Sequence, residues 1–357
     1  PLIHAGGIRD IATARHAIRE GIVDLVGMTR AHLTDPHLVQ HLLAGTEERI
    51  RPCVGASYCL YKKATCIHNA ATGNELTIPH AVTASKTPGR VVVVGGGIAG
   101  LEAARVSALR GHSVVLLEAA TDLGGQMLLA ARAPERAKLV GIVDWRIAEL
   151  NRLGVDIRTN CYAELDEVLA ESPDTVFVAT GGLPDLDGIE GTDLCLSTWD
   201  FLSGGILPAA HVLIHDGTGR APAPSCALHA RKAGSKVTFA TSDGVVGQDM
   251  PYQDNTGDKK RFAEQGIQIM ADLDLLRVEK AGSGVVATFA NTFSGHTVTV
   301  EADQIVVERG TSPLNSLYTT LKSSGLFSGK AYLVGDAVAS RDVHAAIRQA
   351  YVAASTA

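Results

Sequence analysis

The sequence predicts an α/β protein that contains dinucleotide-binding domains. The first observation is the valine run at residues 91–94, which leads directly into the glycine loop at residues 95–100. A short β-branched run is typical of a strand that is buried on both faces. The second observation is another strand, helix and strand pattern over residues 211–240, and the third is a pair of βα units near the N-terminus. A chain of 357 residues is also long enough for more than one folding unit.

Residues 1–50 predict two consecutive βα units. A strand-like run at residues 2–5 is followed by a helix that begins after Asp10 and ends at Gly21. Residues 22–26 form a second strand, and a second helix has Pro36 in its first turn. Two parallel strands cannot cover their own faces, so the rest of the sheet or barrel must come from elsewhere. We therefore expect this chain to be part of a longer protein.

Residues 51–88 predict a connecting region whose cysteines bind metal. Cys53, Cys59 and Cys66 fall within fourteen residues, and the region shows no helical or strand periodicity. Clustered thiols in a chain of this size favour a metal or cluster site over disulfides. Three alternatives are open: an iron–sulfur cluster held by three thiolates with a substituted fourth ligand or in a three-iron form, a zinc site completed by His68, or no metal.

The first glycine loop predicts a site for the ADP half of FAD or for ADP itself, in a domain of residues 89–207 and 309–357. Gly95 makes a tight turn, Gly97 lets the backbone approach a diphosphate, and Gly100 lets the helix pack close to the strand. Glu118 follows the next strand, at residues 113–117, where a carboxylate can accept hydrogen bonds from ribose hydroxyls. Together these features predict dinucleotide binding more strongly than a glycine motif alone.

Three further segments complete this predicted site. Gly125 and Gln126 lie just beyond Glu118, and Thr180 and Gly181 end the strand that begins at Thr175. Asp336 follows a strand at residues 331–334 and precedes the C-terminal helix, so it can meet the ribityl or phosphate region of a flavin. Each segment alone would be an ordinary loop. As a set they predict flavin contacts.

The second βαβ pattern predicts an NAD-binding-like domain of residues 208–308 with a defective nucleotide loop. Gly217 and Gly219 supply two of the expected glycines, but Pro222 stands where the third belongs. A proline has no amide hydrogen to donate to a phosphate. The pattern favours a retained fold with a vacant site. Residues 285–289 and 297–300 alternate like the two strands of a hairpin.

Composition excludes two classes of partner. The formal net charge is −6 and only 4% of the residues are aromatic, so neither a basic field nor stacking platforms favour nucleic acid. No apolar run approaches the roughly 18–20 residues that span a bilayer, and we expect a cytoplasmic protein. Six other conspicuous residues are interpreted as core, interface or capped positions: Trp145, Trp199, His344, Cys161, Cys195 and Cys226.

The order of βα units, cysteine region and glycine loop resembles the C-terminal half of the NADH:flavin oxidoreductases related to trimethylamine dehydrogenase and 2,4-dienoyl-CoA reductase. That resemblance implies the end of a (β/α)8 barrel followed by two Rossmann-like domains. It also implies that Gly7, Gly27 and Arg30 hold an FMN phosphate at the ends of the last two barrel strands. Cys53, Cys59 and Cys66 match ligands of the family's four-iron cluster, with Ala56 where another cysteine would stand.

Within this family the chain looks most similar to demethylases of N-methylated amino acids, on residues 53–59, 197–200 and 335–341. The resemblance implies oxidative N-demethylation, with electrons passing through FMN and the cluster to an electron-transferring flavoprotein. One alternative is an NAD(P)H-dependent 2-enoate or 2,4-dienoyl reductase, and another is a non-catalytic electron-transfer module. We expect an oligomer. The catalytic residues would lie on barrel strands outside this chain.

Three spacings are short for this family, between Cys59 and Cys66 and near residues 217–221 and 323–329. We therefore expect the complete protein to contain further residues at these points. An intact mass equal to that of the 357-residue chain would contradict this expectation.

Overall fold

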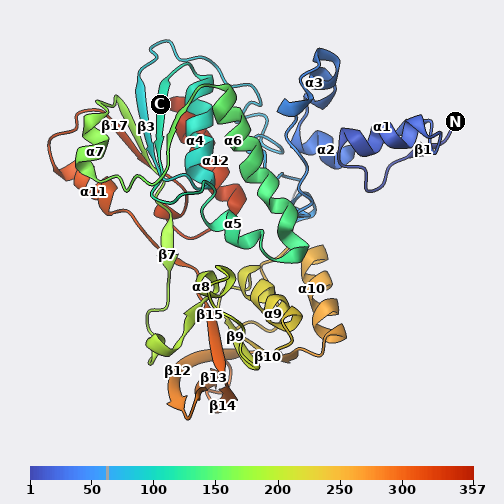
Figure 1. The fold of residues 1–357 in the computed structure, drawn as a ribbon, viewed down its shortest axis with the longest axis vertical. Coiled ribbons are helices and arrows are strands. Elements are labelled where there is room, and N and C mark those ends of the chain that lie inside the picture. Colours follow the sequence, from blue (N-terminus) through green and yellow to red (C-terminus); the bar gives the residue numbers. More distant parts are fainter. Residues whose placement is uncertain (62–63) are drawn as a thin grey trace. The chain divides into compact units, whose positions relative to one another are not determined.

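The computed structural model describes residues 1–61 and 64–357 (Figure 1). The chain divides into two compact units. The first comprises residues 1–127, 138–181 and 313–357, and the second comprises residues 128–137 and 182–312. Each unit combines helices with a parallel sheet, so the predicted α/β class is confirmed. Among the described residues, no helix is both long and apolar enough to span a bilayer.

The first unit is built on a five-stranded parallel sheet in the order β17-β6-β3-β4-β5. The central strand β3 pairs with β4 on one side and β6 on the other, which buries Val92 and Val93 completely. The valine run is a buried strand for this reason. The strand bounds are β3 Arg90–Val94, β4 Ser113–Leu117, β5 Asp156–Arg158, β6 Thr175–Val178 and β17 Lys330–Leu333.

Helices cover both faces of this sheet. Val168 of α7 and Leu321 of α11 pack on one face, while α4, α6 and α12 lie together on the other (Figure 1). Helix α4 begins at Ile98, because the glycine loop itself enters the helix. The helix bounds are α4 Ile98–Leu109, α5 Gln126–Ala130, α6 Gly141–Arg152, α7 Leu165–Ala170, α11 Ser316–Ser323 and α12 Val343–Thr356.

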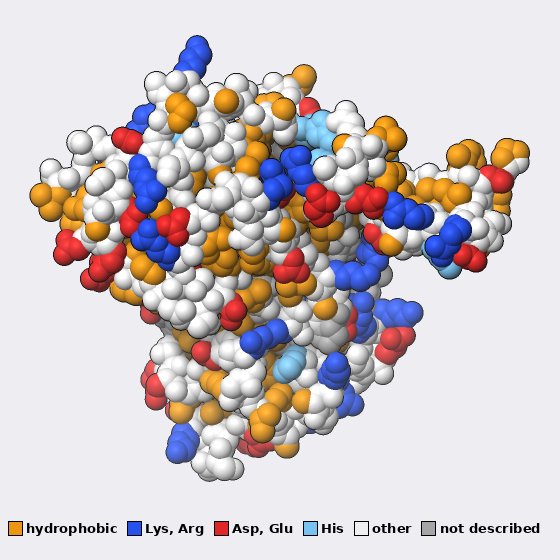
Figure 2. Space-filling view, turned by 45° about the horizontal axis from the view of Figure 1, so that its top comes forward, with side chains coloured by type: hydrophobic (Ala, Val, Ile, Leu, Met, Phe, Trp, Pro, Cys, Tyr) orange, Lys and Arg blue, Asp and Glu red, His pale blue; other side chains and the backbone are white. Residues whose placement is uncertain are grey.

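The N-terminal segment contains the two predicted βα units, but its strands are short. Strands β1 (Ile3–His4) and β2 (Leu25–Val26) form a two-stranded parallel sheet. Ile3 and Leu25 remain 63% and 54% exposed, and Figure 2 shows hydrophobic side chains on the surface of this segment. Helix α1 (Ile11–Arg19) begins at the Asp10 cap as predicted, and α3 is Leu38–Ala44. Helix α2 (Thr29–Thr34) was not predicted.

The second unit has its own five-stranded parallel sheet in the order β11-β10-β9-β15-β8. One core lies between this sheet and α8 and α9, and a second lies between the sheet and an antiparallel layer. The bounds are β8 Leu196–Ser197, β9 His211–Asp216, β10 Lys236–Thr241, β11 Gln268–Met270, β15 Gln304–Glu308, α8 Thr198–Leu202, α9 Pro222–Lys232 and α10 Tyr252–Glu264.

The antiparallel layer confirms the predicted hairpin and adds a strand. Strands β13 (Gly284–Asn291) and β14 (Thr297–Ala302) pair as predicted. Strand β12 (Leu273–Ala281) was missed, because a register shift between Leu275 and Arg277 breaks its alternation. A separate two-stranded sheet joins β7 (Gly182–Pro184) to β16 (Thr311–Pro313).

Candidate functional site

The glycine loop after β3 needs glycine at two positions for steric reasons. Gly95 has a φ of +103°, and a Cβ atom there would lie 2.4 Å from the carbonyl oxygen of Ala179. A Cβ on Gly100 would lie 1.8 Å from the carbonyl oxygen of Gly95. Both contacts involve backbone atoms, which cannot move aside as a flexible side chain can. The loop therefore packs helix α4 tightly against the ends of β3 and β6.

Gly97 differs from its neighbours because it faces open space. It is the N-cap of α4, with a φ of −70°, and no side chain caps the helix there. A Cβ atom on Gly97 would meet no other atom within 4 Å. The amide hydrogens of the first helical turn carry partial positive charge and attract anions. The loop thus combines room for a diphosphate with amide donors at the start of α4 that no described side chain caps.

Glu118 lies directly beside this loop at the end of β4. Its Oε2 accepts a hydrogen bond from Gly96 N at 2.5 Å, and its Oε1 accepts one from Ala120 N at 2.7 Å. These two bonds fix the orientation of the carboxylate. A carboxylate has about four lone-pair positions, so acceptor capacity remains for ribose hydroxyls.

The structure brings most of the predicted flavin contacts together at the start of α4. Gly124 N donates to Gly96 O at 2.8 Å, and a Cβ on Gly125 would lie 3.4 Å from the Cα of Gly97. Gln126 Nε2 donates to Asp336 Oδ2 at 3.2 Å. Gly335, which precedes Asp336, packs against Ala99 in the first turn of the same helix. Three segments distant in the sequence therefore meet at one helix terminus.

Thr180 and Gly181 lie next to the loop but have local partners. The Thr180 hydroxyl donates to the carbonyl oxygen of Leu314, and Leu314 N donates to Gly181 O at 2.9 Å. These bonds join the two chain segments at the end of β6. Gly181 has a φ of +73°, so its turn requires glycine.

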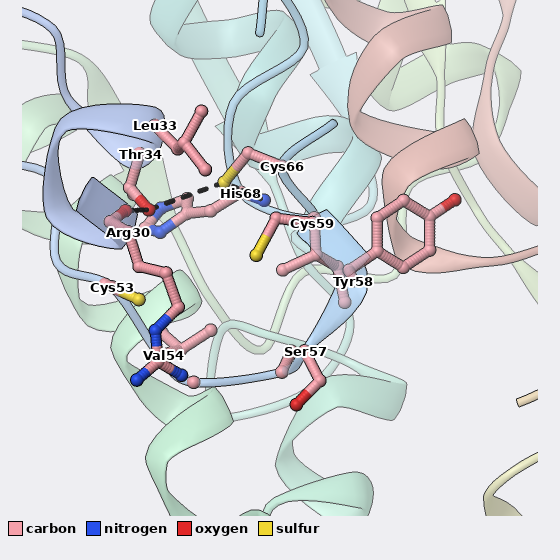
Figure 3. A pocket seen from close by; sticks show the side chains of 13 residues that line it. Arg30, Leu33, Thr34, Cys53, Val54, Ser57, Tyr58, Cys59, Cys66 and His68 are labelled. Atoms are coloured by element: carbon pink, nitrogen blue, oxygen red, sulfur yellow. Dashed lines mark hydrogen bonds between the residues drawn. The ribbon is translucent and has the colours of Figure 1, made fainter. Parts of the chain in front are cut away.

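A pocket beside α2 is lined by all three predicted cysteine ligands (Figure 3). Cys53, Cys59 and Cys66 share this pocket with Ala56 and Arg30. Burial raises the pKa of the Cys59 thiol, and the neighbouring thiols of Cys53 and Cys66 raise it further. Within the described residues, no three His, Cys, Asp or Glu side chains converge closely enough to hold a single metal ion.

Arg30 reaches into the cysteine pocket rather than remaining in the loop after β2. The residue belongs to α2, and its side chain extends toward the space lined by Cys53 and Val54 (Figure 3). Gly7 and Gly27 lie just beyond the paired strands β1 and β2. A Cβ on Gly27 would lie 2.7 Å from the Cβ of Ala5, whereas Gly7 faces open space and has a φ of +73°.

A buried charge network beside the pocket was not foreseen. Arg146 Nε and Arg105 Nη2 donate to Glu102 at 2.9 Å and 2.6 Å, and the side chains of all three residues are at most 5% exposed. Arg51 lies over the ring of Trp145 at 4.4 Å. Burial alone would raise the pKa of Glu102, but the charges of the two bonded arginines lower it to about 2. The only signal in the sequence was a Glu and an Arg three positions apart in an apolar helix.

His68 lies between this network and the cysteine pocket. Burial lowers its pKa well below the ordinary value, and the charges of Arg146 and Arg51 lower it further. The imidazole is therefore neutral at pH 7. Arg146 Nη2 also donates to the carbonyl oxygen of His68 at 3.2 Å, which ties the cysteine segment to α6.

The second βαβ unit fills its own anion site with a carboxylate. Asp216, at the end of β9, is fully buried, and its Oδ1 accepts from Thr218 N and Gly219 N at 3.0 Å each. A nucleotide phosphate bound at this loop would need these same amide donors. Pro222 begins α9 and has no amide hydrogen. A bound phosphate would have to displace the Asp216 side chain from these amides. A vacant nucleotide site in this unit stays a prediction.

Asp216 also predicts a pH effect on the stability of the second unit. Burial raises its pKa to about 7 from 3.8, with a smaller contribution from Glu308, while the loop amides oppose the shift. The folded state thus holds a proton that the unfolded state releases, so this group lowers stability as pH rises from about 4 to 7. We expect Asp216→Asn to remove this slope and to stabilise the unit by about 1–3 kcal/mol at pH 8.

The measurement is urea denaturation at pH 5 to 8, monitored by the fluorescence of Trp199. Asp193→Asn is the matched control, because Asp193 is an exposed carboxylate of the same unit. If the free energy of unfolding of Asp216→Asn changes with pH as steeply as that of the native protein, the raised pKa of Asp216 would be contradicted.

Two curated relatives are similar to this chain along nearly its whole length. The chain is 42% identical to a "Probable N-methylproline demethylase" of Rhizobium meliloti (strain 1021), with 98% of this chain and 56% of that protein covered. A "Multifunctional alkene reductase/demethylase OYE" of Caballeronia cordobensis is also 42% identical, with the same coverage. This chain thus spans about half the length of these curated relatives. The predicted resemblance to N-methyl amino acid demethylases is confirmed.

A solved structure agrees in fold along nearly the whole chain. The 6-hydroxypseudooxynicotine amine oxidase of Pseudomonas geniculata N1 has a TM-score of 0.91 and 26% identity, covering 99% of this chain and 56% of that one. The family model described as "Pyridine nucleotide-disulphide oxidoreductase" matches residues 44–198 and 89–341. The chain therefore belongs to the pyridine nucleotide-disulphide oxidoreductase family.

Proposed function

We propose that this chain is the C-terminal half of a flavin-dependent dehydrogenase that oxidatively demethylates an N-methylated amino acid or amine. The observation that carries the flavoprotein assignment is the open space at Gly97, above uncapped amide donors and beside the fixed carboxylate of Glu118. The names of the relatives support the substrate class. The whole reaction requires residues outside this chain.

The nucleotide in this site is FAD or ADP. The amides at the start of α4 would hold its diphosphate, and Glu118 would bind the adenosine ribose. Gln126 and Asp336, which are hydrogen-bonded to each other, would face the ribityl and phosphate region of a flavin. This assignment places the nucleotide domain within the first compact unit and the NAD-binding-like domain within the second, which also contains β7, β8 and α8.

Residues 1–50 would be the last two βα units of an FMN-binding (β/α)8 barrel. The exposed apolar side chains of β1 and β2 support this, since the remaining barrel strands would cover them. The loops at Gly7 and Gly27 would donate amides to the FMN phosphate, whereas Arg30 extends into the cysteine pocket. FMN, when bound, supplies a hydride acceptor for the N-methyl carbon.

Cys53, Cys59 and Cys66 would hold an iron–sulfur cluster, because all three line one pocket and thiolates are the usual ligands of such clusters. A cluster supplies single-electron transfer from the flavin to an external carrier. We propose that an electron-transferring flavoprotein is that carrier, and that the holoenzyme is an oligomer. Asp216 at the end of β9 supports an external electron acceptor over NAD(P)⁺, because it accepts hydrogen bonds from the loop amides that would otherwise bind the phosphates of NAD(P)⁺.

The reaction conserves atoms and electrons as follows. A hydride leaves the N-methyl carbon, and the resulting iminium takes up water to release formaldehyde and the demethylated amine. The overall reaction releases two electrons and two protons, and the electrons pass to the external acceptor. No residue described here abstracts a proton, because the substrate would lie over the barrel.

The test uses the anaerobic full-length protein. We expect N-methylproline or dimethylglycine to bleach the flavin absorbance and to release one equivalent of formaldehyde per two electrons. NADH and NADPH should leave the spectrum unchanged over the same period. Cofactor extraction should yield FMN together with FAD or ADP.

Each other outcome selects an alternative. Bleaching by NADH without bleaching by any N-methyl compound would replace the demethylase with an NAD(P)H-dependent enoate reductase. Bound FAD or ADP without FMN, and without turnover, would indicate a non-catalytic electron-transfer module.

A further inference from the structure

The proposed cluster lacks one protein ligand at the position of Ala56. Iron–sulfur clusters of the four-iron type are usually held by four cysteine thiolates. Ala56 lines the same pocket as Cys53, Cys59 and Cys66, but a methyl group has no lone pair to bind iron. A fourth donor must come from another residue of the pocket or from a molecule other than the protein.

His68 is the residue of this pocket with a free nitrogen lone pair. Its Nδ1 lies 3.2 Å from the carbonyl oxygen of Pro52, which can only accept, so Nδ1 carries the proton and Nε2 carries the lone pair. His68 is 1% exposed, and its Nε2 has no hydrogen-bond partner among residues 1–61 and 64–357. A buried acceptor without a partner is uncommon in native proteins.

This arrangement is the one that metal-binding histidines adopt. Such residues donate one ring nitrogen to a carbonyl or carboxylate, which fixes the tautomer and aims the other nitrogen at the metal. Here Pro52 provides the carbonyl, and the Trp145 ring lies edge to face with His68 at 5.3 Å. The backbone N–H of His68 also donates to Cys66 Sγ at 3.4 Å, so both residues enter the pocket from one short segment.

We propose that His68 Nε2 is the fourth ligand of the cluster, so that three cysteines and one histidine bind the four irons. This inference rests on the proposed function, because it presupposes the cluster. A cluster fits the pocket better than zinc does. The ligands of a cluster bind different irons and lie further from one another than the ligands of a single zinc ion. The described residues form no group of ligands compact enough for one ion.

The first experiment identifies the ligand by spectroscopy. The full-length protein is purified anaerobically, its iron and sulfide are counted, and it is reduced with dithionite for pulsed electron paramagnetic resonance. We expect a four-iron cluster with hyperfine coupling to a nitrogen nucleus. Growth on ¹⁵N-histidine should convert that coupling to the ¹⁵N pattern, because the nitrogen belongs to an imidazole.

Variants separate ligation from packing. His68→Cys should keep the iron and sulfide, lose the nitrogen coupling and shift the cluster potential to a more negative value, because imidazole ligation raises the potential. His68→Ala should be isolated as a three-iron form. His80→Gln is the matched control, since His80 lies in the same connecting region outside the pocket and should change neither readout.

The outcomes distinguish this inference from the proposed function. A four-iron cluster without imidazole coupling, and with an unchanged potential in His68→Ala, would overturn the assignment of His68 and leave the cluster in place. Absence of iron and sulfide from the anaerobic native protein would overturn the cluster itself. Stoichiometric zinc in place of iron would also overturn it, and with it the electron-transfer role of the pocket.

Discussion

A Gly97→Val variant is expected to fold normally and to lose its nucleotide. The backbone at Gly97 has a φ of −70°, which any residue adopts, and a Cβ atom there meets nothing within 4 Å. The valine methyl groups would fill the space through which a diphosphate approaches the amides of α4. We expect the Kd for ADP to rise at least about 100-fold, which corresponds to roughly 2.7 kcal/mol. Isothermal titration of the nucleotide-free protein with ADP measures this change.

Two further glycine substitutions distinguish a loss of ADP binding from a loss of folding. Gly244→Val makes the same substitution at an exposed glycine of the second unit and should bind ADP like the native protein. Gly100→Ala should fail for a different reason, because its Cβ would collide with the carbonyl oxygen of Gly95 and displace α4. Native ADP affinity in Gly97→Val would show that the diphosphate binds elsewhere.

Glu102→Gln is expected to destabilise the first unit strongly. Glu102 is the carboxylate to which the buried guanidinium groups of Arg105 and Arg146 are bonded. Removing one partner of a buried ion pair leaves an uncompensated charge in a poorly solvated site, which costs about 3–5 kcal/mol. Urea denaturation followed by Trp145 fluorescence measures the loss, in a Trp199→Phe background so that the second unit is silent.

The same substitution should change the acid limb of the stability curve. The pKa of Glu102 is lowered to about 2 in the folded state, from its ordinary value of 4.5. Its stabilisation is therefore complete above pH 4.5 and is lost as pH falls toward 2. Glu102→Gln should lack this loss. The control is Glu47→Gln, an exposed partner of Arg15 in the same unit, which should cost under about 1 kcal/mol. Equal losses in the two variants would contradict a special role for Glu102.

The nucleotide loop was predictable because its determinants are contiguous. Four valines that are buried by two neighbouring strands lead into a turn where residues 95 and 100 have no room for a side chain. The position of Glu118 follows from the next strand, since parallel neighbours end at the same edge of a sheet. These are local rules that require no knowledge of the rest of the chain.

The short elements were harder to predict for an equally physical reason. Helix α2 has only six residues, too few for a periodic pattern, and it contains Arg30. Strand β12 carries an irregular register, so its apolar residues do not alternate cleanly. Periodicity identifies an element only when the element is long and regular.

The sequence by itself determined that this chain contains α/β dinucleotide-binding units, because glycine turns, buried strands and their spacing are properties of neighbouring residues. Only the tertiary structure decided which distant groups neutralise one another. Asp216 accepts hydrogen bonds from the loop amides that a phosphate would need. Among the described residues, the Nε2 of His68 has no hydrogen-bond partner, although it lies in the pocket of the three thiols. Burial decides both, because a charge or lone pair removed from water must find its partner within the fold.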